Sequence, residues 1–286
     1  MKIAILILAH NNIAQLTRLV YHLAADFDVF IHIDKKSDIF LEPFERVKIF
    51  KKFPIYWGSY NTIRGTLFLL KEALCNHYDR YIIISGQDLP IKSNQYIIDF
   101  FSKNESTEFF EFQKLPIPYW KTGGFERIEK YWLNSFRSMS GLRKNIYIVL
   151  EKFTLGFQNF IGIKRTTDYT LYGGANWMDL TKECILKIFE YLDKDKQFLR
   201  RFRYTRCAEE IFFQTVIMNT ELSTTLSNQI PRYIDWTERK ASPKILKVED
   251  LDSIMKSTAL FARKFDDTVD NVIIDQIFEK IGPSKS

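Results

Sequence analysis

The chain has 286 residues, enough for one large domain or two closely merged ones with a sizeable core. A hydrophobic fraction of 46% and an aromatic fraction of 15% exclude a disordered chain. The formal charge of +6, from 41 basic and 35 acidic residues, includes no long run of like charge. It therefore argues against a nucleic-acid-binding arm, and it suits an anionic ligand or an anionic membrane surface.

The cysteines and the first residues indicate the compartment. Cys75, Cys184 and Cys207 are far apart and form no CxxC pair, so neither a zinc site nor a disulfide framework is expected. The apolar run Ile3–Ala9 is too short for a secretory signal and lacks a cleavage site, so it predicts a buried strand. No apolar run is long enough to span a bilayer. We expect a cytoplasmic protein.

The first third of the chain alternates predicted strands and helices. The strands are expected at Ile3–Ala9, Val29–Ile33, Val47–Phe50 and Tyr81–Ser85, and the helices at Asn12–Ala25, Ser59–Asn76 and Ser93–Phe101. Continuous apolar runs such as the first are typical of parallel strands covered on both faces. The alternation predicts a doubly wound α/β sheet.

The stretch from 103 to 164 is less regular and is rich in aromatic residues. The pairs Tyr119-Trp120 and Tyr131-Trp132 suit either the core or stacking on a sugar. A basic amphipathic helix is predicted over Leu142–Phe160. The favoured interpretation packs it on the core through Ile146, Val149 and Leu150, and the alternative is a helix lying on the inner face of a membrane. Further helices are expected around Leu180–Leu192 and Ala208–Met218.

Two aspartates stand where predicted strands end. Asp34 follows Val29–Ile33, and Asp88 follows Tyr81–Ser85 in Ser85-Gly86-Gln87-Asp88-Leu89-Pro90. Open α/β sheets place their ligands at the carboxyl ends of strands, where a carboxylate accepts hydrogen bonds from a base or ribose. The alternative role for Asp34 is a turn or helix cap.

No metal site is expected. Asp88 stands alone, without the Asp-x-Asp clamp used by many nucleotide-sugar enzymes. The triplets Asp193-Lys194-Asp195 and Asp250-Leu251-Asp252 are interpreted as solvated helix caps. The chain also lacks the motifs GxxxxGK, GxSxG, HExxH and GxGxxG. Of its four histidines, His10 and His32 lie at or in strands and fit core positions.

A pair of carboxylates opens the helix around Ala208–Met218. Glu209 and Glu210 point about 100° apart on a helix, so at most one of them faces a given site. Acids in a first turn are also favoured by the helix dipole alone. Because the apolar run Ile211-Phe212-Phe213 follows, we expect Glu210 to be partly buried and able to accept a proton, with Glu209 nearer solvent.

Two adjacent cations lie near the end of the chain in Phe261-Ala262-Arg263-Lys264-Phe265-Asp266. The flanking phenylalanines are expected to anchor the backbone and so to hold Arg263 and Lys264 in place. Fixed adjacent cations suit a diphosphate, because arginine forks onto phosphate oxygens and lysine adds a point charge. A solvated basic turn is the alternative.

In chain order these segments resemble the core-2/I-branching enzyme and peptide O-xylosyltransferase family of inverting glycosyltransferases. The resemblance runs through Leu8-Ala9-His10, His32-Ile33-Asp34-Lys35-Lys36-Ser37, Trp57-Gly58-Ser59, Ser85–Lys92, Gly173-Gly174-Ala175-Asn176-Trp177, Glu210–Val216, Asp235-Trp236, Ser242-Pro243 and Phe261–Asp266. Each segment is a weak signal, and their shared order is a strong one. The last three are more similar to the xylosyltransferase branch.

The resemblance implies a GT-A-like mixed sheet in one catalytic domain over 1–286, with a nucleotide-binding half at 1–102 and an acceptor and catalytic half at 103–286. It implies a UDP-sugar donor, a glycan acceptor and inversion without a divalent metal or other cofactor. The implied base is Glu210. The implied donor contacts are Ala9, Asp34, Asp88, Arg263 and Lys264, and the implied contacts of the transferred sugar and acceptor are Asn176, Trp177 and Trp236.

Without an apparent membrane anchor or disulfides, the chain is most similar to shorter bacterial relatives that build surface polysaccharides. N-Acetylglucosamine and xylose are the sugars the resemblance suggests. Two other classes remain open. A non-catalytic carbohydrate- or nucleotide-binding module needs Asp34 and the Arg263-Lys264 pair but no buried Glu210. A membrane-associated scaffold that recruits partners through Leu142–Phe160 needs this helix exposed and predicts that the site residues do not converge.

Overall fold

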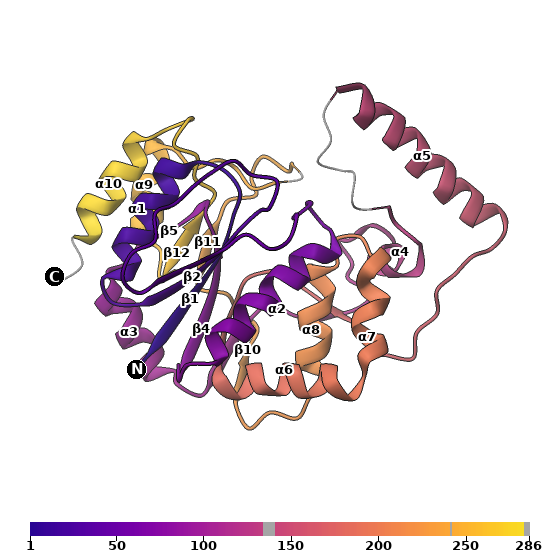
Figure 1. The fold of residues 1–286 in the computed structure, drawn as a ribbon, viewed down its shortest axis with the longest axis horizontal. Coiled ribbons are helices and arrows are strands. Elements are labelled where there is room, and N and C mark those ends of the chain that lie inside the picture. Colours follow the sequence, from indigo (N-terminus) through magenta and orange to yellow (C-terminus); the bar gives the residue numbers. More distant parts are fainter. Residues whose placement is uncertain (134–140, 241, 283–286) are drawn as a thin grey trace.

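A computed structural model describes residues 1–133, 141–240 and 242–282 and shows a mixed sheet with helices on both faces (Figure 1). Its strand order is β10-β6-β9-β4-β1-β2-β3. The parallel strands are β1 (Ile3–Ala9), β2 (Asp28–Ile33), β3 (Val47–Phe50) and β4 (Arg80–Ser85). Beyond β4, β9 (Met178–Thr181) runs antiparallel to both β4 and β6 (Thr107–Phe110), and β10 (Thr225–Ser227) is parallel to β6. The predicted α/β class is confirmed.

Strand β1 divides the core in two because successive side chains point to opposite faces. Ile5 and Ile7 pack in one buried cluster, and Ala4 and Leu6 pack in the other. The first cluster includes side chains of α1 (Ile13–Ala24), α3 (Asn94–Lys103), α9 (Leu251–Lys256) and α10 (Val272–Ile281). The second includes those of α2 (Tyr60–Leu74), α6 (Lys182–Lys194), α7 (Lys196–Arg201) and α8 (Glu209–Met218). Both faces of the parallel strands are therefore covered, as their unbroken apolar sequences require.

A small second sheet joins the end of the chain to the main sheet. It has the order β11 (Arg232–Ile234), β12 (Phe261–Arg263) and β5 (Asp88–Pro90). Strand β12 is antiparallel to β5, and their register sets Arg263 opposite Asp88. The remaining short elements are β7 (Gln113–Lys114), β8 (Tyr172–Gly173), α4 (Phe125–Glu129) and 3-10 turns at Lys121–Gly124, Phe202–Tyr204 and Val248–Asp250.

Helix α5 (Gly141–Phe160) differs from the expectation. It stands apart from the two core layers (Figure 1), and Ile146, Val149 and Leu150 are exposed, so the predicted packing on the core is wrong. The helix contacts the protein through another face. The Tyr147 hydroxyl donates to the Leu133 carbonyl at 2.6 Å, and the buried Gln158 side chain exchanges hydrogen bonds with the Tyr131 backbone.

Candidate active site

Asp34 is held at the carboxyl end of β2. Its backbone N–H donates to the Ala9 carbonyl at 2.8 Å, which ties the ends of β2 and β1 together. The N–H groups of Lys36 and Ile55 each donate to Asp34 Oδ1 at 3.0 Å, and the Lys36 ammonium contacts Oδ2. Burial raises the pKa of Asp34, but these hydrogen bonds and the Lys36 charge outweigh it, so the pKa lies below its ordinary value. Asp34 is thus an ionised acceptor at the strand edge.

His10 lies beside this carboxylate. It is exposed, so its interpretation as a core residue is wrong, whereas His32 is fully buried. The surrounding protein lowers the pKa of His10, the charge of Asp34 opposes this shift, and the cations of Lys264 and Lys36 add to it. His10 is therefore neutral near pH 7 and lies within electrostatic reach of both Asp34 and Lys264.

The Phe261–Asp266 segment is anchored as its sequence predicts. Phe261 and Phe265 are fully buried. Arg263 Nη1 lies 3.1 Å from Asp88 Oδ1 as an ion pair, and the Arg263 guanidinium carbon lies 4.0 Å from the centre of the Trp177 ring. Asp88 is in turn fixed by the Ser85 N–H, which donates to its Oδ2 at 2.6 Å. Asp88 therefore acts here as the partner that orients Arg263.

Lys264 has a fixed backbone and an unpaired ammonium. Its carbonyl accepts from the Leu246 N–H at 2.9 Å, and the next residue, Phe265, donates to the Gln87 carbonyl at 2.9 Å. Within 1–133, 141–240 and 242–282, no carboxylate pairs with Lys264 Nζ. Burial lowers the pKa of Lys264, the adjacent Arg263 charge lowers it further, and Asp266 and Asp88 oppose the shift. An anion bound here would relieve an uncompensated positive charge.

The Gly173-Gly174 turn lies against the helix that carries Glu210. The Gly174 N–H donates to the Glu210 carbonyl at 2.9 Å. A Cβ at Gly174 would lie 2.0 Å from the Glu111 carbonyl oxygen, and one at Gly173 would lie 2.6 Å from the Trp120 ring. No side chain fits at either position, which explains the two glycines.

The residues after this turn reach the cations. The chain from Gly174 to Trp177 spans at most about 11 Å, and it contacts Glu210 at one end and Arg263 at the other. Between them, Asn176 has a buried side-chain oxygen without a hydrogen-bond partner among the described residues. The loop therefore contacts both the backbone at the start of α8 and the Arg263 side chain at the end of β12, and the unsatisfied acceptor of Asn176 lies between these two contacts along the chain.

Glu210 forms an ion pair with Arg127 of α4, at 2.5 Å between Oε2 and Nη1. The side chain is 32% exposed. The protein packed around it raises the pKa of Glu210, the Arg127 charge opposes this shift, and Glu111 adds to it. The Arg127 guanidinium also lies 3.7 Å from the Trp120 ring centre. Glu210 is thus a partly desolvated carboxylate with a fixed direction.

Glu209 is the buried member of the pair, so the expectation that it lies nearer solvent is wrong. The residue is 7% exposed, and its Oε2 has no hydrogen-bond partner in the described structure. Burial and the neighbouring Glu210 charge raise the pKa of Glu209 to about 8. The reason is that seven of the eight α8 residues after Glu210 are buried. The apolar run therefore lies against the core all round and does not distinguish the two acids.

Trp236 follows β11, whose last residue is paired with Arg263, and is 53% exposed. It lies at the carboxyl end of β11, on the same edge as Arg263 and Lys264, which we call the tail cations. Ala9 is buried at the end of β1, with its carbonyl already bonded to Asp34. The roles predicted for Trp236 and Ala9 remain predictions.

Neither Arg127 nor the contact of Lys36 with Asp34 was predicted from the sequence. Lys36 had a local signal, since it lies two residues after Asp34. Arg127 had none, because it lies 83 residues from Glu210 along the chain.

The Asp-x-Asp triplets behave as caps. Asp195 accepts from the Gln197 and Phe198 N–H groups at the start of α7, and Asp250 accepts from the Lys247 N–H. In the described ranges, no group of three or more His, Cys, Asp or Glu side chains is arranged to hold a metal ion. None of the helices in the described ranges has the length and apolarity that crossing a bilayer needs.

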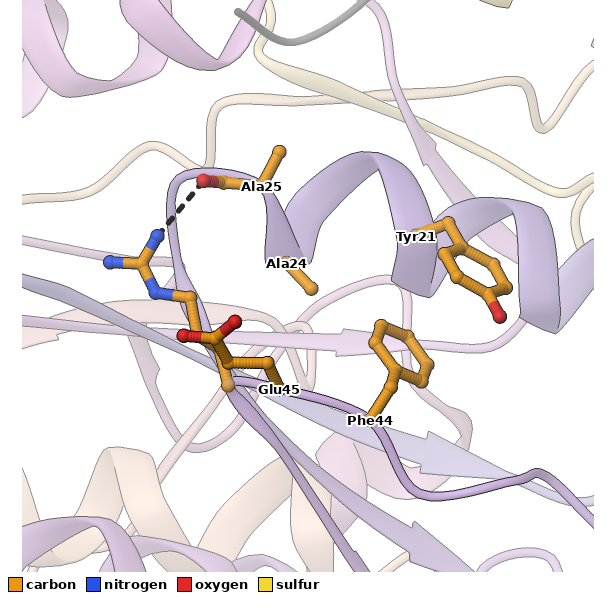
Figure 2. Close-up of a pocket in the computed structure, with 6 residues that line it drawn as sticks. Tyr21, Ala24, Ala25, Phe44 and Glu45 are labelled. Atoms are coloured by element: carbon orange, nitrogen blue, oxygen red, sulfur yellow. Dashed lines mark hydrogen bonds between the residues drawn. The ribbon is translucent and has the colours of Figure 1, made fainter. Parts of the chain in front are cut away.

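A separate surface hollow of about 530 Å³ lies beside the end of α1, away from these residues. Figure 2 shows the Tyr21 and Phe44 rings side by side there, and their centres are 4.4 Å apart. On the other side of the hollow, Arg46 donates to the Ala25 carbonyl at 2.9 Å. These contacts join α1 to the segment before β3, and we assign the hollow no ligand.

The family model for the Core-2/I-Branching enzyme matches residues 3–255, a range that ends before Arg263 and Lys264. The xylosyltransferase of Ciona intestinalis is 22% identical over 96% of this chain and 33% of its own length. Xylosyltransferase 2 of Mus musculus is 25% identical with the same coverage. The chain thus spans about a third of the length of these curated relatives. A solved mannose-1-phosphate geranyltransferase from Thermus thermophilus shares 11% identity over 79% of this chain and 69% of its own, with a TM-score of 0.34, too low to carry an argument.

Proposed function

This chain belongs to the core-2/I-branching enzyme family of glycosyltransferases, and we propose from that premise that it moves a sugar from a UDP-sugar to a hydroxyl of a glycan acceptor, with inversion. The main support for this proposal is the 173–177 loop. Its Gly174 N–H donates to the Glu210 carbonyl at the start of α8, and its Trp177 ring contacts the Arg263 guanidinium. A single displacement needs a base on one side of the sugar and a charge-stabilising group on the leaving side. The loop's two contacts support that arrangement.

Each residue then has a distinct role. The acceptor hydroxyl attacks the anomeric carbon while Glu210 takes its proton, and the bond to the UDP oxygen breaks on the opposite face. Lys264 and Arg263 stabilise the charge that develops on the diphosphate, which is work a divalent metal does in other enzymes. We therefore propose that no metal is needed. Asp34 and Ala9 belong to the uridine pocket, and Asp88 acts through Arg263.

Asn176, Trp177 and Trp236 are proposed to contact the transferred sugar and the acceptor. The unpartnered oxygen of Asn176 suits a sugar hydroxyl, and the two indoles suit a sugar face. In this proposal residues 1–102 form the donor half and 103–286 the acceptor and catalytic half. The sugar is of N-acetylglucosamine or xylose type, and the setting is bacterial surface polysaccharide synthesis in the cytoplasm, peripheral to the inner face of the membrane.

The second candidate is a non-catalytic binding protein for nucleotide-sugars or carbohydrates. It would use Asp34 and the tail cations but would have no need of Glu210. The ion pair that orients Glu210, together with its raised pKa, favours the enzyme, because both prepare a carboxylate to accept a proton.

A screen of UDP-sugars separates the two candidates. The protein would be incubated with UDP-N-acetylglucosamine, UDP-xylose and related donors, and both thermal stabilisation and release of UDP would be measured. Slow UDP release with at least one donor supports the enzyme. Stabilisation without release from any donor, including in the presence of glycan acceptors, would identify a binding protein.

A further inference from the structure

Helix α5 carries a continuous apolar stripe on the side turned away from the protein. Ile146, Val149, Leu150, Phe153, Phe157 and Phe160 are all exposed, and Phe153 is 70% exposed. At 100° per residue, these six positions occupy an arc of only about 100°. We refer to them as the α5 stripe.

The opposite side of α5 is the one that meets the protein. Tyr147 and Gln158 are buried there, and Glu151, Thr154 and Leu155 are half-buried. These five positions fill a second arc of about 100°, whose centre lies about 140° around the helix from that of the first. The stripe is therefore not the face through which α5 packs on the rest of the protein. It is a separate surface, and its three phenylalanines are of the kind that interfacial helices insert below lipid headgroups.

The charges around α5 indicate what covers the stripe. Residues 141–165 contain five basic side chains and one acidic one, and Lys152 is exposed between the stripe and the protein-facing side. A neighbouring hollow of about 540 Å³ between α4 and α5 is lined by Lys121, Lys130 and Lys164 together with Glu126 and Glu129. Lys121 and Lys164 form ion pairs with Glu126 and Glu129 there, and Lys121 still has 84% of its side chain exposed.

We propose that α5 docks this protein on an anionic lipid surface, lying in the plane of the headgroups with its stripe in the acyl region. The basic excess complements anionic lipid, each lysine or arginine near such a surface adding to the attraction. A second copy of the chain is a poorer partner, because two such stripes would bring like-charged basic segments together in a chain that already carries +6.

Docking would set the position of the active site. Helix α4, which supplies Arg127 to Glu210, is joined to the segment that follows α5 by the Glu129–Lys164 ion pair at 3.0 Å and by the Arg165 N–H, which donates to the Glu129 carbonyl. Together with the proposed transfer reaction, docking implies that the acceptor is a glycan held at the membrane. This statement about the acceptor rests on the proposed function. The docking itself does not depend on the reaction.

The test is flotation with vesicles of phosphatidylcholine, alone or mixed with an equal part of phosphatidylglycerol. The intact protein should float with the mixed vesicles, less with the neutral ones, and should be released by high salt. Phe153→Ser should lower the partition coefficient by about tenfold. The matched control is Phe40→Ser, since Phe40 is 71% exposed in the loop between β2 and β3, outside α5, and its loss should change nothing.

A second variant tests the charge separately. Lys152→Gln should weaken binding to the mixed vesicles and leave binding to the neutral ones unchanged. Equal binding by Phe153→Ser and Phe40→Ser would overturn the proposal, as would failure of the intact protein to float. A dimer in light scattering that Phe153→Ser disrupts, with no flotation, would show that a second copy covers the stripe. UDP release measured without vesicles stays an independent test of the proposed function.

Discussion

Replacing Lys264 by alanine removes the member of the Arg263-Lys264 pair that has no carboxylate partner among the described residues, and it should slow sugar transfer without weakening the fold. In the free protein the Lys264 ammonium has no carboxylate partner among the described residues, and its pKa is lowered by burial and by Arg263. Its charge therefore opposes folding. A bound diphosphate supplies negative charge beside the ammonium, so that the Lys264 charge stabilises the complex.

The expected loss follows from that arrangement. Two unit charges 4 Å apart at an effective dielectric constant of 20 interact by about 4 kcal/mol. Loss of one preorganised group at a developing negative charge costs about 2.7–4 kcal/mol, or 10²–10³-fold in kcat. The loss of kcat in Lys264→Ala should lie in that range, and the variant should also bind UDP more weakly. Arg263→Ala should cost folding stability as well, because it leaves the buried Asp88 unpaired.

The assay is steady-state UDP release, with UDP affinity and thermal unfolding measured on the same samples. Lys256→Ala is the control, because Lys256 is an exposed lysine eight residues earlier. The folded state binds fewer protons at Lys264 than the unfolded state, so wild-type stability should rise as pH approaches the ordinary lysine value of 10.5, and the variant should lack this rise. Wild-type kcat and UDP affinity in Lys264→Ala would refute the role given to the tail.

Three further results are expected. Turnover should survive EDTA, because Arg263 and Lys264 supply the charge at the diphosphate; loss of activity on chelation with recovery on adding manganese would contradict this. Because the folded pKa of Glu209 is about 8 against an ordinary 4.5, stability should fall as pH rises from about 4.5 to 8, and thermal melts of Glu209→Gln should lack this fall. Arg127→Ala should raise the pKa of Glu210 and move the acidic limb of the kcat/KM profile to higher pH; an unmoved limb would show that Glu210 does not set it.

The main sheet and its helices were predictable because their signals are local. Parallel strands covered on both faces read as unbroken apolar runs, and Ile3–Ala9 and Tyr81–Ser85 are such runs. The anchoring of Arg263 and Lys264 by Phe261 and Phe265 was also visible in one short segment.

What could not be predicted depends on contacts distant in sequence. The Arg127–Glu210 pair joins residues 83 apart, and no spacing rule relates them. The pattern of α5 shows that one face is apolar but not what covers it, so Ile146, Val149 and Leu150 were assigned to the wrong partner.

One paired measurement tests whether Glu210 is the base of a UDP-sugar-dependent transfer. UDP affinity and turnover would be measured for the wild type, Glu210→Gln and Glu209→Gln. Glutamine keeps the shape of glutamate but cannot accept the proton, so Glu210→Gln should bind UDP normally and lose about 10²–10⁴-fold in turnover. Glu209→Gln should turn over at nearly the wild-type rate. Near-normal turnover in Glu210→Gln with loss in Glu209→Gln would contradict the account.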